Sequence, residues 1–491
     1  MDKKFLILYL LLFVLITPVL FINLGKQPLY VWDEARVAVN AVEMLQDKNF
    51  IVTSYEGLPD LWNTKPPLLI WMQCLSIKLF GYNEFAVRLP SAIAALCTCV
   101  VLALFFAKRN YHLIAFLSCL ILISQESFTE YHAARAADYD VLLTLFTTCY
   151  VLSFFAYLES KKSKYIFLTS IFIGLSVLCK GVAGLLFTPA LFIYSIFRRE
   201  TLTIFKERNF YFGLGISFIT VATYYLLREH YNPGYLHAVW NNELGGRSTE
   251  AIEGHVEDWD FYIKNLSGYH FSYHWYYLLL SIPAGILIKD KFINRLTIYL
   301  TLTVVFYLTV ISSAATKLIW YDIPLLPLLS IMASICLYFI YYIIARKISV
   351  RFSDKYSIAV AILLTVAVLI HPYSFSLRAS INAPLLDIGP PEAQHAAELL
   401  KELTTNKPNL VTKDTLYLCY PDYYSPFNFY EKVLKINGIT MARKTNLENL
   451  SLPAFVIVPR EAQQEYIKKN YNYSIELEKQ NVKLLKIINK Y

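Results

Sequence analysis

The sequence predicts an α-helical polytopic membrane protein that ends in a small α/β domain facing water. Apolar residues make up 56% of the 491 positions and charged residues only 17%, which is below the quarter usual for soluble domains. Apolar runs near the ~20 residues that span a bilayer recur along most of the chain. After His371 these runs stop, and Pro, Asn, Lys and Glu become frequent. The change marks a boundary between a membrane domain and a water-facing domain.

About eleven helices are expected to cross the membrane. The first, 5–24, follows the basic start Lys3-Lys4 and has no small-residue cleavage site at its end, so we expect a retained helix rather than a signal peptide. The other predicted spans are 87–107, 111–128, 138–158, 165–183, 184–197, 209–228, 274–288, 295–314, 318–342 and 356–372.

Lysines and arginines give the orientation, because they gather in cytoplasmic loops. The basic clusters fall on alternate connections and at the N-terminus, which places the N-terminus in the cytoplasm of a plasma (inner) membrane protein. The outer side then receives long loops at 25–86 and 229–273, together with the C-terminal domain. The net charge of +8 follows from this topology, and we expect no binding of nucleic acid.

Two domains are predicted. Residues 1–372 form the transmembrane domain with its two long outer loops, and residues 373–491 form an extracytoplasmic domain of ordinary size. In the latter, Ala393–Leu403 has helical spacing, whereas Thr415–Cys419, Ala454–Val458 and Val482–Ile488 have the composition of strands. A small α/β domain is expected.

The first outer loop carries charges of both signs. Asp33–Asp47 is amphipathic and Pro67–Phe80 is mostly apolar but too short for a span, so we expect two helices lying along the membrane. Asp33 and Arg36 are i and i+3 neighbours in the first helix and can point the same way. A surface ion pair or an N-terminal helix cap explains the spacing equally well.

Further ionisable side chains mark the outer ends of spans. Lys65 precedes Pro66-Pro67, which fixes an extended backbone suited to phosphate binding, although a lysine snorkelling to the interface is the commoner arrangement. Boundary marking also explains such charges. Their shared outer face nevertheless brings together a carboxylate that accepts protons and cations that hold phosphate. The residues concerned are Asp33, Arg36, Lys65, Arg88, Asp140, Lys180, His255, Lys317 and Tyr321.

Several short motifs occur in an order typical of one family. They are Asp33-Glu34-Ala35-Arg36, Lys65-Pro66-Pro67-Leu68, Phe80-Gly81 with Arg88-Leu89-Pro90-Ser91-Ala92, and Cys179-Lys180-Gly181. Over about residues 1–345 the chain resembles the GT-C glycosyltransferases of the protein mannosyltransferase and aminoarabinose (ArnT-like) transferase superfamily. The resemblance implies inverting transfer of a sugar from a polyprenyl-phosphate donor to a lipid or protein acceptor at the outer face of the membrane.

The resemblance also implies roles for single residues. Asp33 matches the catalytic aspartate, as general base or as a group that orients the acceptor, with Glu34 in support. Arg36, Lys65 and Lys180 match the cations that grip the donor phosphate. Asp140 matches an acid that positions the acceptor or the first loop.

The second outer loop resembles the aminoarabinose branch of the family. The match rests on Glu243 with Arg247, and on His255, which would line the site or help to bind a metal. Where that branch commonly has an acid before the motif lysine, this chain has Thr64. This departure weakens the prediction of a divalent metal and of lipid A as acceptor, so the metal requirement, the sugar and the acceptor stay open.

Two other classes of protein compete with a glycosyltransferase. A transporter or flippase of a lipid-linked substrate would place ionisable residues near the bilayer midplane and use broken helices. Here the ionisable residues lie mainly at the ends of spans, although Gly174, Gly181 and Gly184 permit a break. An adhesion protein anchored by its spans would need only one or two of them. The sequence favours the enzyme.

Overall fold

Two compact units make up the computed structural model, which describes residues 3–130, 132–245, 256–349, 354–385, 389–405, 410–411, 415–448 and 450–491. The helical unit consists of Met1–Ile22, Asp60–Leu69 and Pro90–Asn382. The mixed unit consists of Asn23–Pro59, Ile70–Leu89 and Ala383–Tyr491. Parts of the first outer loop therefore belong to the same unit as the C-terminal region, an association that the predicted division at 372/373 did not anticipate.

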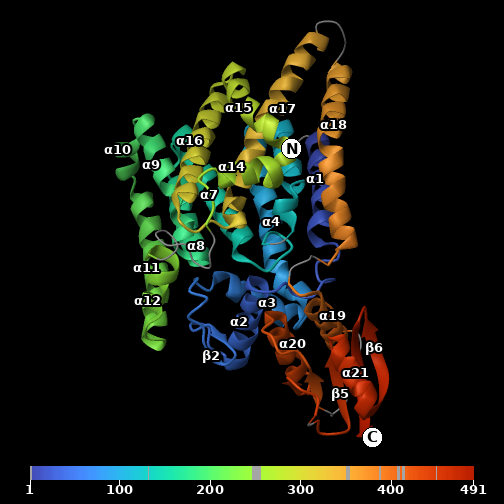
Figure 1. The fold of residues 1–491 in the computed structure, drawn as a ribbon. Coiled ribbons are helices and arrows are strands. Elements are labelled where there is room, and N and C mark those ends of the chain that lie inside the picture. Colours follow the sequence, from blue (N-terminus) through green and yellow to red (C-terminus); the bar gives the residue numbers. More distant parts are fainter. Residues whose placement is uncertain are drawn as a thin grey trace. The chain divides into compact units, whose positions relative to one another are not determined.

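The helical unit is built from long apolar helices (Figure 1). Within the described ranges, eight segments are long and apolar enough to cross a membrane. They are formed on α1 (Lys3–Phe21), α4 (Glu84–Ala107), α7 (Tyr139–Ser160), α8 (Ser163–Lys180), α11 (Arg208–Tyr231), α16 (Lys291–Ser313), α17 (Leu326–Ser349) and α18 (Asp354–Asn382). The chain is thus a multi-pass membrane protein.

Three other predicted spans correspond to shorter helices, so the count of eleven stays a prediction. These are α5 (His112–Ile123), α9 (Thr188–Phe197) and α15 (Trp275–Leu287). Short helical elements fill the connections: α6 (Glu126–Thr129), η1 (Gly181–Leu185), α10 (Thr201–Phe205), α12 (Tyr235–Val239), η2 (Trp240–Gly245), α14 (Phe261–Asn265), η4 (Leu266–His270), η5 (Ser272–His274) and η6 (Ile319–Leu325).

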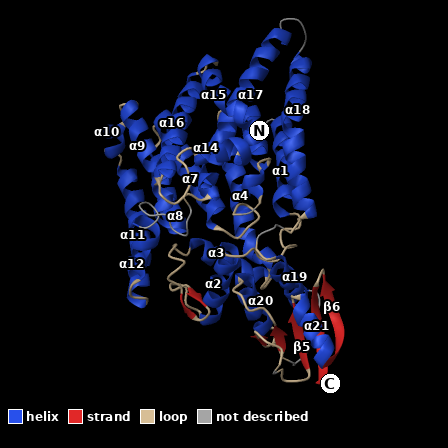
Figure 2. Cartoon of the chain, viewed as in Figure 1, coloured by secondary structure: helices blue, strands red, loops and turns tan. Residues whose placement is uncertain are grey.

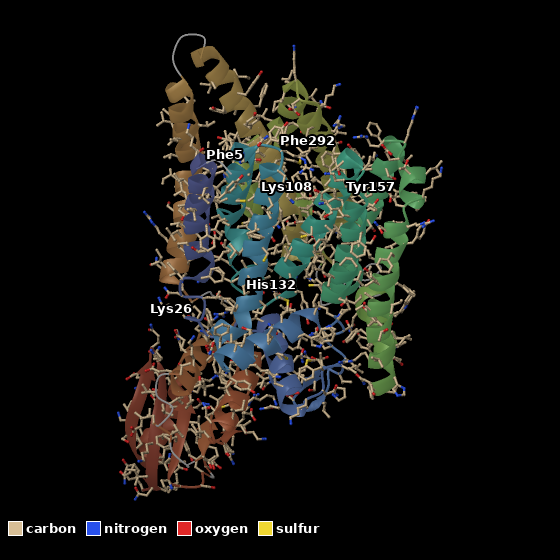
Figure 3. All side chains as sticks on the ribbon, turned by 180° about the vertical axis from the view of Figure 1, so that it is seen from behind. Phe5, Lys26, Lys108, His132, Tyr157 and Phe292 are labelled. Carbon is tan, nitrogen blue, oxygen red and sulfur yellow. The ribbon has the colours of Figure 1, made fainter. Side chains whose placement is uncertain are left out.

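The two ends of the helical unit carry different residues. Phe5, Lys108, Tyr157 and Phe292 lie toward one end, whereas His132 lies toward the other (Figure 3). The first group comes from the predicted cytoplasmic ends of α1, α4, α7 and α16, and His132 follows α5 and α6 on the predicted outer side. These helices therefore present their predicted cytoplasmic ends toward the same end of the helical unit, and their orientation in the membrane stays a prediction.

Helix α18 corrects one predicted boundary. The sequence places its end at 372, because the apolar run stops and the composition changes after His371. The helix instead continues to Asn382 with the proline inside it. Its last turns are fixed on α1, since the Tyr373 hydroxyl donates to the Leu15 carbonyl at 3.0 Å and Ser380 Oγ donates to the Val19 carbonyl at 2.7 Å. Side-chain bonds between helices of this kind stabilise a helix that contains proline.

Small residues bring α8 and α11 into close contact. A Cβ atom built on Gly174 would lie 2.4 Å from Ser217 Oγ, and one built on Gly213 would lie 2.7 Å from Ser170 Cβ. Because lipid tails are as apolar as leucine, close backbone packing of this kind replaces the hydrophobic effect in holding membrane helices together. Helix α7 packs on the same α8. This packing fixes the helices that carry Asp140 and Lys180.

The strands of the described chain all belong to the mixed unit (Figure 2). A hairpin, β1 (Ser54–Tyr55) with β2 (Leu58–Pro59), follows helix α2 (Asp33–Asp47), and α3 (Leu68–Phe80) comes after it. The five-stranded sheet has the order β4-β3-β5-β7-β6. The strands of this sheet are β3 (Leu416–Leu418), β4 (Met441–Arg443), β5 (Ala454–Val458), β6 (Tyr471–Lys479) and β7 (Val482–Lys490). The helices of the same C-terminal region are α19 (Pro391–Thr405), α20 (Ser425–Ile436) and α21 (Glu461–Asn470).

The sheet is mixed, which explains its hydrophobic pattern. Strand β3 is parallel to β4 and β5, whereas β7 is antiparallel to β5 and β6. The central strand β5 is buried along its whole length, as expected of a strand flanked on both sides. The predicted helix 393–403 and the strands 415–419, 454–458 and 482–488 are confirmed, while α20, α21, β4 and β6 were not predicted. Strand β6 was not predicted because few of its side chains are buried, so its sequence lacks the hydrophobic pattern of a strand.

Candidate active site in the helical unit

A cavity of about 360 Å³ lies within the helical unit and combines ionisable groups with apolar walls. Two lysines and two acids line it, and they come from the 60–69 segment, α7, the end of α8 and the second outer loop. Its lining residues are Lys65, Asp140, Leu143, Lys180, Val182, Ala183, Leu186, Glu243, Tyr307, Val310, Ile311, Ser313, Ala314, Thr316 and Tyr321. Five predicted site residues therefore meet here, although they are widely spaced in sequence.

Lys180 and Asp140 form a buried ion pair on the cavity wall. The Lys180 ammonium donates to Asp140 Oδ1 at 2.6 Å and to Oδ2 at 2.7 Å. The side chains are 9% and 2% exposed, and the ammonium also lies 5.6 Å from the centre of the Tyr321 ring. An ammonium group has three N–H donors, so two bonds to Asp140 leave one for a ligand in the cavity.

The chain places Lys180 by ending helix α8 there. Gly181 has φ +56°, a conformation that side chains rarely adopt, and the shorter helix η1 follows at once. A Cβ atom on Gly184 would lie 2.5 Å from the Ser176 carbonyl carbon, so η1 can fold back on α8 only with glycine at that position. The helix ends before Gly181, one of the three glycines that permit a break, whereas Gly174 lies inside α8. Lys180, at the end of the helix, lines the cavity.

Asp138 fixes the start of α7 and thereby the position of Asp140. Its carboxylate accepts from the Tyr139 N–H at 2.6 Å as the helix cap, and it bonds the His132 ring. Although burial opposes ionisation, His132 and Lys180 lower the pKa of Asp138 to about 2. The His132 ring stacks on Trp320 at 3.6 Å between ring centres. An imidazole beside a carboxylate is a ligand pair that suits a transition metal, and the metal requirement stays open.

The segment that carries Lys65 is held by buried polar groups of the helical unit. Arg228 donates to the Asp60 carbonyl at 3.1 Å, and Asn63 Nδ2 donates to the Tyr139 hydroxyl at 3.0 Å. The Lys65 ammonium lies 5.6 Å from the centre of the Tyr139 ring and lines the cavity. Among the described residues, no hydrogen bond or ion pair of the Lys65 ammonium accompanies this ring contact, so its N–H donors can bind an anion.

The structure supplies an acid beside Thr64. Glu243, from the second outer loop, accepts a hydrogen bond from Thr64 Oγ1 at 3.1 Å. The Tyr235 hydroxyl donates to the Thr64 carbonyl at 2.8 Å, which ties the same loop to this position. The acid that the family has next to its motif lysine is thus matched here by a residue distant in sequence. Arg247 and His255, predicted on this loop, lie outside the described residues.

Lys317 and Tyr321, which were predicted to mark the outer end of a span, differ in whether they line the cavity. Tyr321 lines the cavity, whereas the Lys317 ammonium donates to the Ala314 carbonyl at 2.9 Å. Tyr307 also lines the cavity, and its hydroxyl donates to the Tyr321 carbonyl at 2.9 Å. Sequence reasoning missed Tyr307, because a tyrosine inside an apolar span carries no signal of its own.

The remaining predicted residues belong to the mixed unit. Asp33 opens helix α2 and is partly buried. The Arg36 guanidinium lies over the Tyr55 ring, 4.2 Å from its centre. Asp33 and Arg36 share the first turns of α2, as their spacing predicts.

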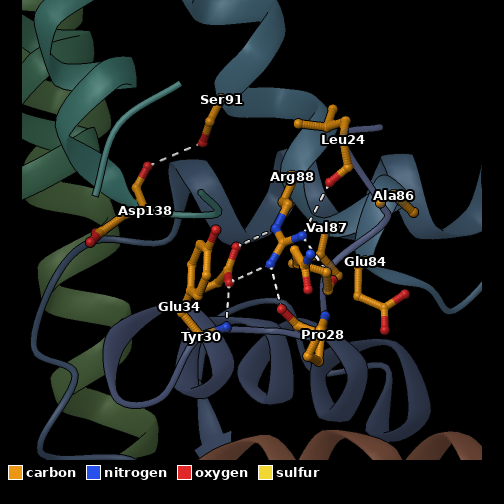
Figure 4. Close-up of polar contacts among 12 residues, drawn as sticks. Leu24, Pro28, Tyr30, Glu34, Glu84, Ala86, Val87, Arg88, Ser91 and Asp138 are labelled. Atoms are coloured by element: carbon orange, nitrogen blue, oxygen red, sulfur yellow. Dashed lines mark hydrogen bonds and ion pairs between the residues drawn. The ribbon is translucent and has the colours of Figure 1, made fainter. Parts of the chain in front are cut away.

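Glu34 and Arg88 form the most heavily bonded ion pair of the mixed unit (Figure 4). Arg88 donates to the two Glu34 oxygens at 2.7 and 2.9 Å and to the carbonyls of Leu24, Gln27 and Pro28. All five guanidinium N–H groups are thereby used. Glu34 also accepts from the Tyr30 N–H at 2.6 Å. This pair fixes the entry to α2, so we interpret Glu34 as support for the position of Asp33.

Comparisons with known proteins agree with this arrangement. A family model described as dolichyl-phosphate-mannose-protein mannosyltransferase matches residues 64–226. The undecaprenyl phosphate-alpha-4-amino-4-deoxy-L-arabinose arabinosyl transferase of Aeromonas hydrophila is 28% identical over 327 residues, 63% of this chain and 56% of that protein.

Solved structures show the same fold. ArnT from Cupriavidus metallidurans, bound to undecaprenyl phosphate, matches with a TM-score of 0.68 at 15% identity over 97% of each chain. The Archaeoglobus fulgidus oligosaccharyltransferase in its apo form matches with a TM-score of 0.55 at 11% identity, over 96% of this chain and 70% of that one.

The fold is a multi-pass arrangement of membrane-length helices that is shared with ArnT and with the oligosaccharyltransferase. The family model and the relatives show that the chain is similar in sequence to protein mannosyltransferases and to aminoarabinose transferases. The chain spans about half the length of the curated relatives it matches, 44% and 56% for two of them.

Proposed function

We propose that this protein transfers a sugar from a polyprenyl-phosphate donor to a hydroxyl group of a lipid or protein acceptor. The observation that carries the proposal is the cavity in which Lys65 and Lys180 stand among apolar walls. A lipid-linked phosphate needs both cations and apolar walls, because its head group is an anion and its tail is a hydrocarbon. The relatives are named as transferases of a sugar carried on undecaprenyl phosphate, and such a donor has this chemistry.

In this reaction the acceptor oxygen attacks the anomeric carbon of the sugar, and the bond from that carbon to the phosphate oxygen breaks. The electron pair of the broken bond stays on the polyprenyl phosphate, whose negative charge therefore rises. Lys65 and Lys180 stabilise this leaving group, and Arg36 is the third cation that the sequence predicts for it. Asp33 takes the proton of the acceptor hydroxyl as general base.

Asp140 has a different role from Asp33 in this proposal. Both of its oxygens accept from Lys180, so it holds the ammonium at the cavity wall. Removing Lys180 would leave a buried carboxylate without this partner, and removing Asp140 would free the ammonium to turn away. We therefore assign Asp140 to positioning of the phosphate-binding lysine.

The location of the reaction follows from the orientation of the chain. The distribution of basic residues places the cavity-lining ends of α7 and α8 at the outer face of the plasma membrane, with the N-terminus cytoplasmic and the C-terminal region extracytoplasmic. A sugar donor carried by a membrane lipid suits that location, since nucleotide sugars are cytoplasmic reagents. The relatives' aminoarabinose is the first sugar to test.

Transfer from labelled donors in membranes tests the proposal. Membranes with the native chain are compared with membranes containing Asp33→Asn, after both proteins are shown to be inserted and folded. We expect transfer by the native chain and a loss of about 10²–10⁴-fold in the variant, the usual contribution of a general base. Equal transfer by both would remove Asp33 from the mechanism.

The donor panel contains undecaprenyl-phosphate aminoarabinose and mannose, and the acceptors are lipid A and membrane proteins. Label in lipid identifies a glycolipid transferase, and label in protein identifies a protein transferase. Absence of transfer from every donor, with intact protein, would contradict the proposed function.

A further inference from the structure

We infer that the C-terminal region positions the catalytic loop through a clamp formed by Tyr423, Ser425 and Asn428 at the start of α20. The inference rests on the proposed function, because it concerns the residues adjoining Asp33 and Arg36. All contacts described below lie within the mixed unit. They join two segments separated by more than three hundred positions in the sequence.

The first arm of the clamp holds Trp32, the residue before Asp33. Trp32 has φ 70° and ψ −117°, which a residue with a side chain rarely adopts. Its backbone N–H donates to Ser425 Oγ at 2.8 Å, and its ring lies 6.1 Å from the ring of Tyr423. Such a backbone persists only where its surroundings fix it. The Ser425 hydroxyl therefore helps to set the direction in which the chain enters α2 and presents Asp33.

The second arm holds the ring on which Arg36 rests. The Tyr55 hydroxyl bonds the Tyr423 hydroxyl at 2.6 Å, and it accepts from Asn428 Nδ2 at 2.5 Å. Asn428 Nδ2 also donates to Glu56 at 2.8 Å in the turn of the β1–β2 hairpin. Burial and Tyr423 raise the pKa of Tyr55, so its phenol stays neutral. Asn428 and Tyr423 thereby fix the ring that faces the Arg36 guanidinium.

The remainder of α20 holds the rest of the loop. The Lys432 ammonium lies 2.6 Å from Glu43 Oε1 near the end of α2, and the Tyr430 hydroxyl donates to Glu84 at 2.6 Å. Lys401 of α19 pairs with the same Glu84 at 3.2 Å. Helices α2 and α20 pack directly on each other (Figure 1). These contacts bind the loop at a distance from Asp33, whereas the clamp contacts Trp32, which precedes Asp33, and Tyr55, which lies beside Arg36.

The Ser425 arm therefore acts on the orientation of Asp33 rather than on donor binding. Misplacing a reacting group by 1 Å lowers the rate by about 10²-fold. Lys65 and Lys180, which line the cavity, belong to the helical unit, whereas the contacts of the clamp belong to the mixed unit. We expect loss of the Ser425 arm to lower kcat while the KM for the donor is preserved. Loss of the Asn428 arm should also raise the donor KM, because that arm fixes the ring beside Arg36.

Three variants and one control test the clamp in the full-length protein. Ser425→Ala removes the acceptor of the Trp32 N–H, Ser425→Thr keeps a hydroxyl, and Asn428→Ala removes the donor to Tyr55. Ser474→Ala is the matched control, because Ser474 is an exposed residue of strand β6 whose hydroxyl donates to its neighbour Glu476. Transfer kinetics and thermal unfolding are measured for each.

Ser425→Ala and Asn428→Ala are both expected to lower kcat about 10-fold or more, with the unfolding temperature near that of the control. The donor KM should stay within about 2-fold in Ser425→Ala and rise in Asn428→Ala, because Asn428 holds the ring beside Arg36. Ser425→Thr should recover most of the rate. A kcat equal to that of the control in both alanine variants would overturn the inference. A parallel loss of folded protein in Ser425→Ala and Ser425→Thr would also overturn it, because the segment would then serve folding alone.

Hydrogen exchange gives a result that does not depend on activity. The Trp32 amide should exchange at least about 10-fold faster in Ser425→Ala than in the native chain, because it loses its acceptor. If no donor supports transfer, the proposed function fails, and the exchange still decides whether the clamp exists. Unchanged exchange at Trp32 would overturn the clamp even in an active enzyme.

Discussion

Two buried ion pairs look alike in the sequence and differ in the structure. Arg88–Glu34 and Lys180–Asp140 each join a cation and an acid at a helix end, and each is almost completely shielded from solvent. In the mixed unit, the Arg88 donors are all used by Glu34 and by three carbonyls. In the helical unit, Lys180 and Asp140 line a cavity that is large enough for a ligand. The use of all hydrogen-bond donors, rather than burial, separates the pair that we interpret as structural from the pair that we propose to be functional.

The comparison also bears on the competing classes of protein. A transporter would use an ionisable pair that exchanges partners near the midplane. Here the cavity pair lies at the start of α7 and the end of α8, and the comparisons favour a transferase. An anchor for an adhesion domain has no use for such a cavity. The following variants test the distinction between the two pairs.

The largest effect is expected for Arg88→Met, which leaves Glu34 buried without its cation. Breaking one partner of a buried pair costs about 3–5 kcal/mol of unfolding free energy. Thermal unfolding in detergent and the yield of folded protein measure it. The double variant Arg88→Met/Glu34→Leu should recover much of the loss, because no buried charge then remains. Lys483→Ala, which breaks a pair on the half-exposed edge of β7, is the control and should cost less than about 1 kcal/mol.

The second effect concerns the cavity pair. Lys180→Gln should lower the rate of transfer about 10²–10³-fold, as expected for loss of one preorganised group at a developing charge. Adding Asp140→Asn should restore stability without restoring the rate. Transfer kinetics and unfolding temperature are measured together. Recovery of the rate in the double variant would show that this pair, like Arg88–Glu34, only supports the fold.

A smaller effect is expected for Lys65→Gln. Binding of undecaprenyl phosphate should weaken about 10-fold, which corresponds to ~1.4 kcal/mol for one charge-assisted contact. Lys65→Arg should retain most of the affinity, because the positive charge stays. Binding of the labelled lipid to purified protein measures both, with Lys78→Gln as the control, since Lys78 lies beside Phe50 in the mixed unit. Equal affinity in all three variants would remove Lys65 from phosphate binding.

The smallest effect arises where two acids meet instead of an acid and a cation. Burial and the neighbouring Glu126 raise the pKa of Glu130 to about 8 from its ordinary value near 4.5. The folded state therefore holds a proton that the unfolded state releases between these values, so stability falls as the pH rises from about 5 to 8. Glu130→Gln should flatten this part of the curve of unfolding temperature against pH. A curve of unchanged slope would contradict the shift.

The sequence predicted much of the helical unit because membrane spans follow from local composition. In the helical unit, Lys65, Asp140 and Lys180 meet as their predicted common face suggests. In the mixed unit, helix α2 has the predicted bounds. Helix α18 passed its predicted end because contacts with α1 stabilise a helix that contains proline. The role of Tyr307 was hidden, since an aromatic side chain in a span has the same composition whether it faces lipid or a cavity.

The sequence by itself determined the membrane class and the residue types of the proposed site, and it predicts the orientation of the helices. These depend on the length of apolar runs and on the sign of charges near them, both of which are local properties. Only the tertiary structure decided which charges are saturated, that Glu243 stands beside Thr64, and that α20 packs on α2 of the first loop. Those facts depend on contacts between segments that are distant in the sequence, and local spacing does not predict such contacts.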